Sequence, residues 1–374
     1  MKIFHIGNEF DTVGGVRCVN YLHHHFYLSL RDLGHTVIYY PAEKIRRPFS
    51  EELRGDIIRI LKEEKPDVLF LFVGPDFEKD FARKITDGFP VVTIGVFVDD
   101  DGGYYDAWQY WKDCFDWNVT FYPPAVRWRA ARKENVIGIN WACRPGGLYR
   151  PLPLKKDKDI DVSFIGGAGP QRREFIEKLE KKIGMKVRCF GKGWSGGVVT
   201  SEEMVAIFNR SKINLNISGQ PMNPFLRPRS LARLFFSRNQ ETLKFVFNPF
   251  GLPDNIRTFL NFLNPMSRAR PYEVLASGSF VLSHLANEFG VPLRDGEEIV
   301  IYKDLNDLAR KTRFYLSRDE EAARIARRGH ERVVREHTFQ NRIRFILDTI
   351  FSDTTIPKKR KNGQEGRSVV QRCQ

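Results

Sequence analysis

The chain of 374 residues contains few cysteines and no long hydrophobic segment. Its five cysteines are scattered without the close spacing of a metal site, and so sparse a set is typical of reduced thiols in a cytoplasm. No run of about 18 apolar residues occurs, so we predict no transmembrane helix. The N-terminal MKIFHIGNEF lacks the apolar core of a signal peptide. These absences together predict a cytoplasmic protein.

Acidic residues are scarce in two segments, and this is where much of the net charge of +14 arises. Residues 219–270 contain eight Arg or Lys against two acids, and residues 352–374 contain six against two. Two local basic segments favour polyanion contacts at those segments over a general nucleic-acid-binding surface. The second segment includes PKKRK (357–361), which is typical of polyanion-binding patches, although a solvated tail is the simpler interpretation. We expect 352–374 to be disordered.

Strand-like and helical patterns alternate along the rest of the chain. Runs such as DVLFLFV (67–73) and PVVTIGVFV (90–98) are apolar throughout, as in parallel sheets covered on both faces. A Pro-, Gly- and charge-rich stretch near residue 150 is typical of a linker, and a second alternation follows it. We therefore expect an α/β protein of two Rossmann-like domains with parallel sheets facing a central cleft. The expected units are an N-terminal domain at 1–152, a C-terminal domain at 153–338 with a helical insertion at 219–266, a helix at 339–351 that crosses back, and the tail at 352–374.

One glycine-rich turn is followed closely by an arginine. In FIGGAGPQRREF (164–175), Gly166 and Gly167 stand between a predicted strand and a predicted helix. Arg172 lies in the first turn of that helix, so free N–H groups and a guanidinium would together bind a diphosphate. The alternative is that Arg172 belongs to a pair of surface arginines.

A second glycine turn lies near the N-terminus, in IGNEFDTVGGV. Helical spacing of apolar residues over 16–33 places Gly14 and Gly15 at the start of a helix, where the backbone can approach a ligand in the cleft. An ordinary tight turn explains the two glycines equally well.

The third candidate segment is RARPYEVLASGSFVLS, residues 268–283. Arg268 and Arg270 stand at the start of a short predicted helix that Gly278 ends. The carboxylate of Glu273, in the first turn, could accept hydrogen bonds from both hydroxyls of a ribose while the arginines hold phosphates. Alternatively, Glu273 only stabilises the helix N-terminus.

These segments together resemble glycosyltransferases of the GT-B fold. From about residue 160 to 350, the sequence is most similar to the CgeB-like group with its "glycosyl transferases group 1" C-terminal domain. The matching segments are DVSFIGGAGPQRREFI, SKINLNIS, RARPYEVLASGSFVLS and the long run from GEEIVIYKDL to EHTFQNRI, in that order. The first half matches more loosely, through GGV…LRDLGHTVIYYP and GVFVDDDGGYYDAW.

The resemblance implies an enzyme that moves a sugar from a nucleoside diphosphate sugar, most commonly a UDP-sugar, to an acceptor hydroxyl. It implies no bound metal and no other cofactor, an acceptor side at 1–152 and a donor side at 153–338. The donor-binding residues that it implies are Gly166, Gly167, Arg172, Ser218, Arg268, Arg270, Glu273 and Gly278. Many retaining members carry a second Glu eight residues before the ribose-binding Glu; Pro265 stands there in this chain, so a retaining mechanism is not implied.

An acidic loop follows the apolar run at 90–98. At the end of a strand, its carboxylates would face the cleft and could remove a proton from the acceptor. Adjacent acids also raise one another's pKa, which suits a base near neutral pH. We expect Asp100 to be the catalytic base, with Asp99 as the alternative, unless the loop is simply solvated.

The segment 219–270 is longer than the corresponding family loop and contains eight Phe. It could pack as an extra helical subdomain, form a flap over the acceptor, or lie on an anionic membrane. Aromatic and basic residues together could also bind nucleic acid, which would make the chain a DNA- or RNA-modifying glycosyltransferase. A further alternative is a catalytically silent binding or structural protein on the same fold. The acceptor itself stays unidentified.

Overall fold

The structure is a computed structural model. The residues that it describes are 1–41, 50–73, 77–98, 100, 110–111, 113–153, 158–218, 231, 233–239, 244–261, 266–286, 288–290, 292–352 and 366–371.

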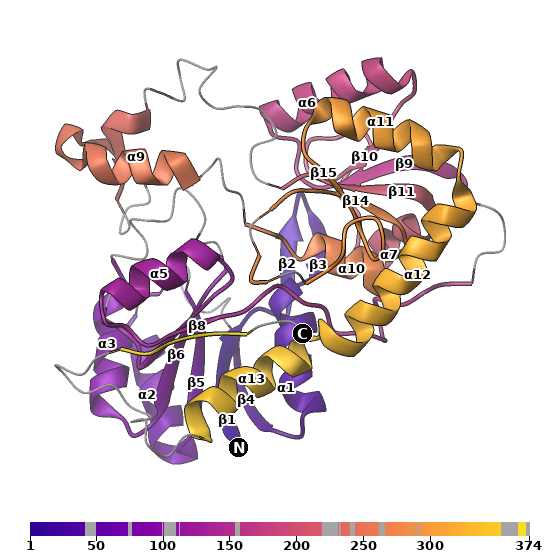
Figure 1. The fold of residues 1–374 in the computed structure, drawn as a ribbon. Helices are drawn as coiled ribbons and strands as arrows, with labels where there is room; N and C mark the ends of the chain where they lie inside the picture. Colours follow the sequence, from indigo (N-terminus) through magenta and orange to yellow (C-terminus); the bar gives the residue numbers. More distant parts are fainter. Residues whose placement is uncertain are drawn as a thin grey trace.

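The N-terminal domain is built on a seven-stranded parallel sheet with the order β16-β8-β7-β6-β5-β1-β4 (Figure 1). Its strands are β1 (Lys2–Gly7), β4 (Thr36–Pro41), β5 (Val68–Phe72), β6 (Val92–Phe97), β7 (Trp117–Thr120), β8 (Val136–Gly138) and β16 (Ser368–Val370). Its helices include α2 (Glu51–Glu64), α3 (Lys79–Gly88) and α5 (Pro123–Ala131). Alternate residues of β5 pack into different cores, Phe70 into one and Leu69 into the other. Both faces are therefore covered, which is why the apolar runs are continuous.

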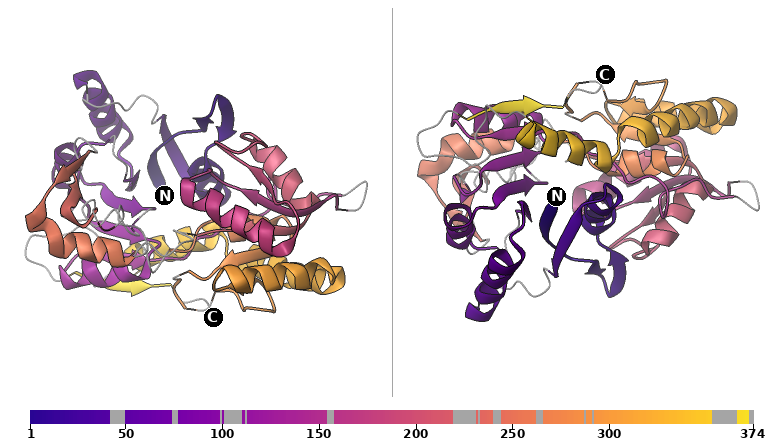
Figure 2. Two further views of the ribbon diagram at one scale, coloured as in Figure 1. Left: turned by 90° about the horizontal axis from the view of Figure 1, so that it is seen from above. Right: turned by 90° about the horizontal axis from the view of Figure 1, so that it is seen from below.

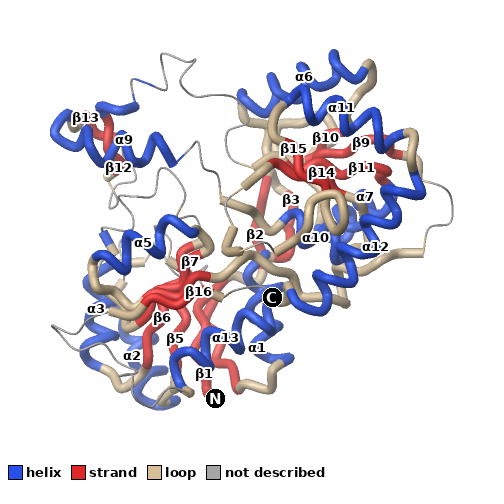
Figure 3. Tube along the Cα trace, viewed as in Figure 1, coloured by secondary structure: helices blue, strands red, loops and turns tan. Residues whose placement is uncertain are grey.

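The C-terminal domain has a five-stranded parallel sheet with the order β10-β9-β11-β14-β15 (Figure 3). The strands are β9 (Ile160–Ile165), β10 (Arg188–Phe190), β11 (Ser211–Asn216), β14 (Val281–His284) and β15 (Val300–Tyr302). The helices are α6 (Pro170–Ile183), α7 (Ser201–Arg210), α10 (Arg270–Ala276), α11 (Leu305–Leu316) and α12 (Asp319–Glu336). Two parallel-sheet α/β domains confirm the fold predicted from the sequence. Within the described residues, no helix is long and apolar enough to cross a membrane.

The last helix, α13 (Phe339–Phe351), leaves the C-terminal domain and packs against α1 (Leu28–Asp32) of the N-terminal domain (Figure 2). Buried side-chain hydrogen bonds hold α13 and the C-terminal domain against the N-terminal domain. Arg342 is buried and its Nε donates to the carbonyl of Asn140 at 3.0 Å. The amide of Asn140 in turn exchanges two hydrogen bonds of 2.8 Å with the backbone of Phe289. The two domains thus share buried polar contacts beside the cleft.

The prediction of a helix over 16–33 is wrong at its start. Residues 10–19 form an antiparallel hairpin, β2 (Phe10–Val13) and β3 (Val16–Val19), followed by the short π-helix η1 (His23–Tyr27) and α1. Gly14 and Gly15 are the two turn residues, with φ of 56° and 83°. Two successive positive φ values make a type I′ turn, which matches the twist of a hairpin and favours glycine at both positions.

The prediction of a disordered tail is wrong for Ser368–Val370, which form β16 at the edge of the N-terminal sheet, parallel to β8. The three residues are β-branched or small and pair with Val136, Ile137 and Gly138. The segment PKKRK lies outside the described residues.

Gly329 allows α12 to approach α10. Replacing it with alanine tests this contact, because helix propensity favours alanine whereas steric overlap disfavours it. A Cβ at Gly329 would lie 2.1 Å from the carbonyl oxygen of Glu298 and 2.7 Å from Leu275. Helix propensity favours alanine by about 1 kcal/mol, but such overlap costs more. We expect Gly329→Ala to destabilise the fold by roughly 2 kcal/mol or more in urea unfolding.

The matched control is Gly55→Ala in α2. Its added Cβ would meet nothing within 4 Å. We expect Gly55→Ala to stabilise the protein by about 0.5–1 kcal/mol. Equal effects of the two substitutions would contradict the packing described for α10 and α12.

Candidate functional site

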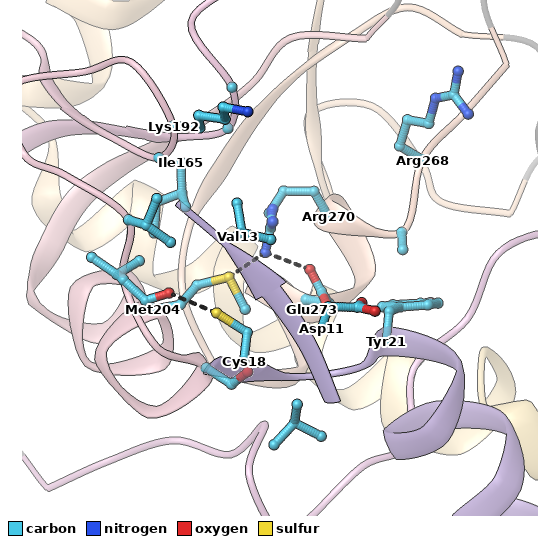
Figure 4. Close-up of a pocket in the computed structure, with 18 of the residues that line it drawn as sticks. Asp11, Val13, Cys18, Tyr21, Ile165, Lys192, Met204, Arg268, Arg270 and Glu273 are labelled. Carbon is cyan, nitrogen blue, oxygen red and sulfur yellow. Dashed lines mark hydrogen bonds and ion pairs between the residues drawn. The ribbon is translucent and has the colours of Figure 1, made fainter. Parts of the chain in front are cut away.

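A pocket of about 660 Å³ lies between the two domains. The N-terminal domain contributes the hairpin β2–β3 and the residues that follow it, and the C-terminal domain contributes the ends of β9 and β11, the start of α7, and α10 (Figure 4). The carboxyl ends of parallel strands are where α/β proteins bind ligands. A volume of this size accommodates a nucleotide-sized molecule.

Glu273 is the buried carboxylate of this pocket. Its side chain is 4% exposed, and Oε2 lies 2.6 Å from the guanidinium of Arg270. Burial alone would raise the pKa of Glu273, but Arg270, His25 and Tyr149 together lower the pKa to about 2. Glu273 is therefore ionised at neutral pH and retains acceptor capacity on both oxygens, since each oxygen has two lone pairs.

His25, from η1, reaches Glu273 across the domain boundary. Its Nδ1 accepts a 2.8 Å hydrogen bond from the backbone N–H of Arg144, and its Nε2 lies 3.5 Å from Glu273 Oε1. Burial, with the nearby Arg144 and Arg270, lowers the pKa of His25. The neutral ring must therefore carry its proton on Nε2, directed at Glu273. The N-terminal domain thus fixes the orientation of a carboxylate that belongs to the C-terminal domain.

Three basic residues from different segments form a cationic wall of the pocket. Arg172 and Arg268 both line the pocket, together with Lys192. Burial and the proximity of Arg268 lower the pKa of Arg172, which means that the two guanidinium groups repel each other. Arg172 also donates to the carbonyl of Gly167 at 3.3 Å. An anion bound here would relieve the repulsion and meet the free N–H groups of the α6 N-terminus.

The arginines at the start of α10 point in different directions. Arg270 reaches toward Glu273 and the sulfur of Met204, whereas Arg268 extends away from them (Figure 4). Arg270 therefore supports the carboxylate, and Arg268 belongs to the cationic wall.

The hairpin β2–β3 forms the opposite wall, which the sequence interpretation missed. Asp11 and Cys18 line the pocket, and Asp11 Oδ2 accepts a 2.8 Å hydrogen bond from Asn20. At the tip, a Cβ on Gly14 would lie 3.1 Å from Val198 of the C-terminal domain. The signal was present in the sequence, because a Gly-Gly pair between two β-branched segments is typical of a hairpin.

Other expected donor-binding residues occupy different places. Gly166 and Gly167 line the pocket. Gly278 does not line it: its φ of 69° ends α10, and its lack of a Cβ admits Pro151 of the linker. Ser218 is buried at the end of β11, where its Oγ accepts a 3.1 Å hydrogen bond from Asn216, itself a lining residue.

The expected base lies deeper than the acidic loop suggested. Asp100 is 4% exposed and is not among the lining residues. Its Oδ2 lies 3.6 Å from the fully buried Arg129 of α5, which also pairs with Glu134 at 3.1 Å. Asp99 lies outside the described residues. Val98, one residue earlier, is the part of this strand end that lines the pocket.

Comparisons with known proteins agree with this geometry. Residues 171–236 and 238–348 match the sequence model of a family described as glycosyl transferase-like. No curated protein sequence matches the chain.

Solved structures match almost the whole chain. A sucrose-phosphate synthase from Thermosynechococcus elongatus is 10% identical with a TM-score of 0.58, covering 94% of this chain and 99% of its own. A glycosyltransferase from Rickettsia africae ESF-5 is 10% identical with a TM-score of 0.59, over the same shares of the two chains. Anabaena Alr3699/HepE in complex with UDP-glucose is 9% identical with a TM-score of 0.56, covering 94% of this chain and 100% of its own. At such identities the likeness shows a shared fold, the GT-B arrangement of two Rossmann-like domains.

Proposed function

We propose that the chain transfers a sugar from a UDP-sugar to an acceptor hydroxyl, because its C-terminal domain matches the model of a glycosyl transferase-like family and its fold is GT-B. The observation that carries this proposal is the pairing, in one pocket, of an ionised buried carboxylate with a wall of cations. A nucleoside diphosphate has matching chemistry, since its ribose offers hydroxyl donors and its diphosphate offers negative charge. HepE, a protein of the same fold, is described in complex with UDP-glucose, and this supports uridine as the nucleoside.

In the proposed complex, Glu273 accepts hydrogen bonds from the two ribose hydroxyls while Arg270 and His25 hold the carboxylate in place. The diphosphate lies against Arg172 and Arg268 and the backbone turn of Gly166 and Gly167. These groups stabilise the negative charge that develops on the leaving UDP as its bond to the sugar breaks, so we propose that no metal is required.

The acceptor approaches from the N-terminal domain in this proposal. Its hydroxyl oxygen bonds to the anomeric carbon, the bond from that carbon to UDP breaks, and the acceptor proton passes to a carboxylate. Among the described residues, Asp11 is the acid of the N-terminal domain that lines the pocket, and Asn20 orients it. Asp100 is held in the interior by Arg129. We therefore propose Asp11 as the base in place of Asp100.

Asp11→Asn is expected to lower kcat by about 100-fold or more, because general-base catalysis of this kind contributes that much. The Kd of the donor should change little, since the proposal assigns donor binding to Glu273 and the arginines and not to Asp11. Asp100→Asn should instead reduce the Tm, because it leaves the buried Arg129 with less compensating charge. If Asp100→Asn alone lowers kcat while Tm is kept, the base lies in the acidic loop as the sequence predicts.

The activity itself can be tested before an acceptor is known. Glycosyltransferases hydrolyse their donor slowly, so incubation with a panel of UDP-sugars should release UDP from at least one of them. Arg172→Ala should slow the release at a donor concentration below the wild-type KM. No UDP release from any donor, with or without added hydroxyl acceptors, would favour a catalytically silent protein on the same fold.

A further inference from the structure

The insertion between β11 and α10 exposes an unusual amount of apolar surface. Its described elements are η4 (Arg233–Phe235), β12 (Phe236–Arg238), β13 (Phe245–Phe247), η5 (Pro249–Gly251) and α9 (Leu252–Asn261). They lie outside both parallel sheets (Figures 1 and 3). Eight of the thirteen exposed large hydrophobic side chains in the described residues belong to these elements. Phe250 is 96% exposed, Phe247 64% and Phe245 61%.

Among the side chains of this unit that the structure describes, the buried one is polar. Asn255 of α9 is only 6% exposed, and its amide donates to the carbonyl of Leu234 at 2.9 Å. Ser237 of β12 donates to Asn255 at 3.1 Å and accepts from Asn248 at 3.1 Å. A water-soluble subdomain buries its Phe and exposes its Asn and Ser, so this unit has the reverse polarity.

In the β12–β13 hairpin, the exposed Phe side chains lie on one face. Phe236 pairs with Phe247 in the β12–β13 register, and their rings lie 5.6 Å apart. Phe245 is two residues from Phe247 and so lies on the same face, while Ser237 on the opposite face meets α9. An exposed face of three Phe, continued by Phe250, needs an apolar partner in the functional protein.

The charge of the segment indicates the kind of partner. Residues 231–261 carry four Arg or Lys against two acids, and Lys244 is exposed beside Phe245. An exposed apolar face with an exposed lysine beside it matches a bilayer that has an acyl interior and anionic headgroups. Nucleic-acid bases would match the Phe rings, but not the exposed aliphatic side chains Ile256 and Leu260 of α9.

We propose that the insertion is a membrane-contact element that lies on the surface of an anionic lipid bilayer. Phe245, Phe247 and Phe250 enter the boundary between headgroups and acyl chains, and Lys244 meets the lipid phosphates. This proposal does not depend on the sugar donor.

Co-sedimentation with vesicles tests it on the full chain. The wild type should pellet with vesicles of phosphatidylcholine and phosphatidylglycerol, and much less with pure phosphatidylcholine. The triple variant Phe245→Ser, Phe247→Ser, Phe250→Ser should lose about tenfold or more of this binding, because bilayer affinity scales with buried apolar area. Lys244→Glu should weaken binding to the anionic vesicles only, and salt should do the same.

The matched control is Leu285→Ser with Phe314→Ser, which removes exposed apolar side chains outside the insertion, 51% and 36% exposed. It should leave vesicle binding unchanged, and all variants should keep the wild-type Tm and its shift with UDP-sugar. A wild type that stays in the supernatant with both vesicles would overturn the proposal. So would a triple variant that converts a dimer into a monomer in sedimentation velocity without lipid, since a second copy of the chain would then cover the face.

Discussion

Replacing Glu273 with alanine should weaken the binding of UDP-sugar by roughly 100-fold. Two hydrogen bonds from ribose hydroxyls to an ionised carboxylate contribute about 1.5 kcal/mol or more each, and their loss of about 3 kcal/mol corresponds to that factor in Kd. Burial does not neutralise the group, because Arg270 and His25 help to lower its pKa to about 2. Isothermal titration with UDP gives the Kd directly.

The substitution also has a structural effect that must be separated from binding. Without Glu273, Arg270 loses its partner at 2.6 Å, and the proton on His25 Nε2 faces no carboxylate. Removing one member of a buried ion pair costs about 3–5 kcal/mol, less here because Arg270 is 27% exposed. Glu273→Gln keeps the shape and one acceptor oxygen, so it should keep more of the stability than of the affinity.

Glu288→Gln is the matched control. Glu288 is a carboxyl group that accepts a 2.9 Å hydrogen bond from Tyr272, and it does not line the pocket. Burial raises the pKa of Glu288, and a glutamine there keeps the shape of the side chain and an oxygen that accepts from Tyr272. The control should bind UDP like the wild type. A Glu273→Gln protein with unchanged Kd would place the ribose elsewhere.

Arg172→Ala should weaken UDP by about 10- to 100-fold and leave uridine nearly unaffected. One charge-assisted hydrogen bond to a phosphate is worth about 1.5–3 kcal/mol, which corresponds to that range. Uridine lacks the diphosphate and so makes no use of the guanidinium. The ratio of the two Kd values therefore isolates the phosphate contact from any general disturbance of the pocket.

Lys178→Ala provides the control for charge on the same helix. Lys178 is an exposed residue of α6 that pairs with Glu174 at 2.9 Å. Its removal changes the net charge equally but should not alter the Kd of UDP. Equal losses of UDP and uridine affinity in Arg172→Ala would mean that Arg172 shapes the pocket and does not hold the diphosphate.

Much of the fold was predictable because its signals are local. The continuous apolar runs of β5 and β6 require helices on both faces, and Pro271 favours the start of α10 where it occurs. The hairpin β2–β3 was missed because apolar spacing over 16–33 also fits a helix. Only the Gly14–Gly15 turn decides between the two patterns.

The remaining differences depend on contacts between distant segments. Asp100 follows a strand, as a catalytic acid would, but Arg129 comes from α5 and holds it in the interior. The pairing of β16 with β8 joins residues more than 200 positions apart. Phe content alone predicts burial of the insertion, and only the structure shows that Ser237 and Asn255 lie inside and Phe250 outside.

A thermal-shift titration of the wild type with UDP-, GDP-, dTDP- and ADP-sugars tests the central claim most directly, because a ligand that binds only the folded state raises Tm. We predict that a UDP-sugar gives the largest rise, and that Glu273→Gln reduces this rise while Glu288→Gln does not. If no nucleotide sugar raises Tm, or if the rise is the same in Glu273→Gln, the pocket is not a donor site.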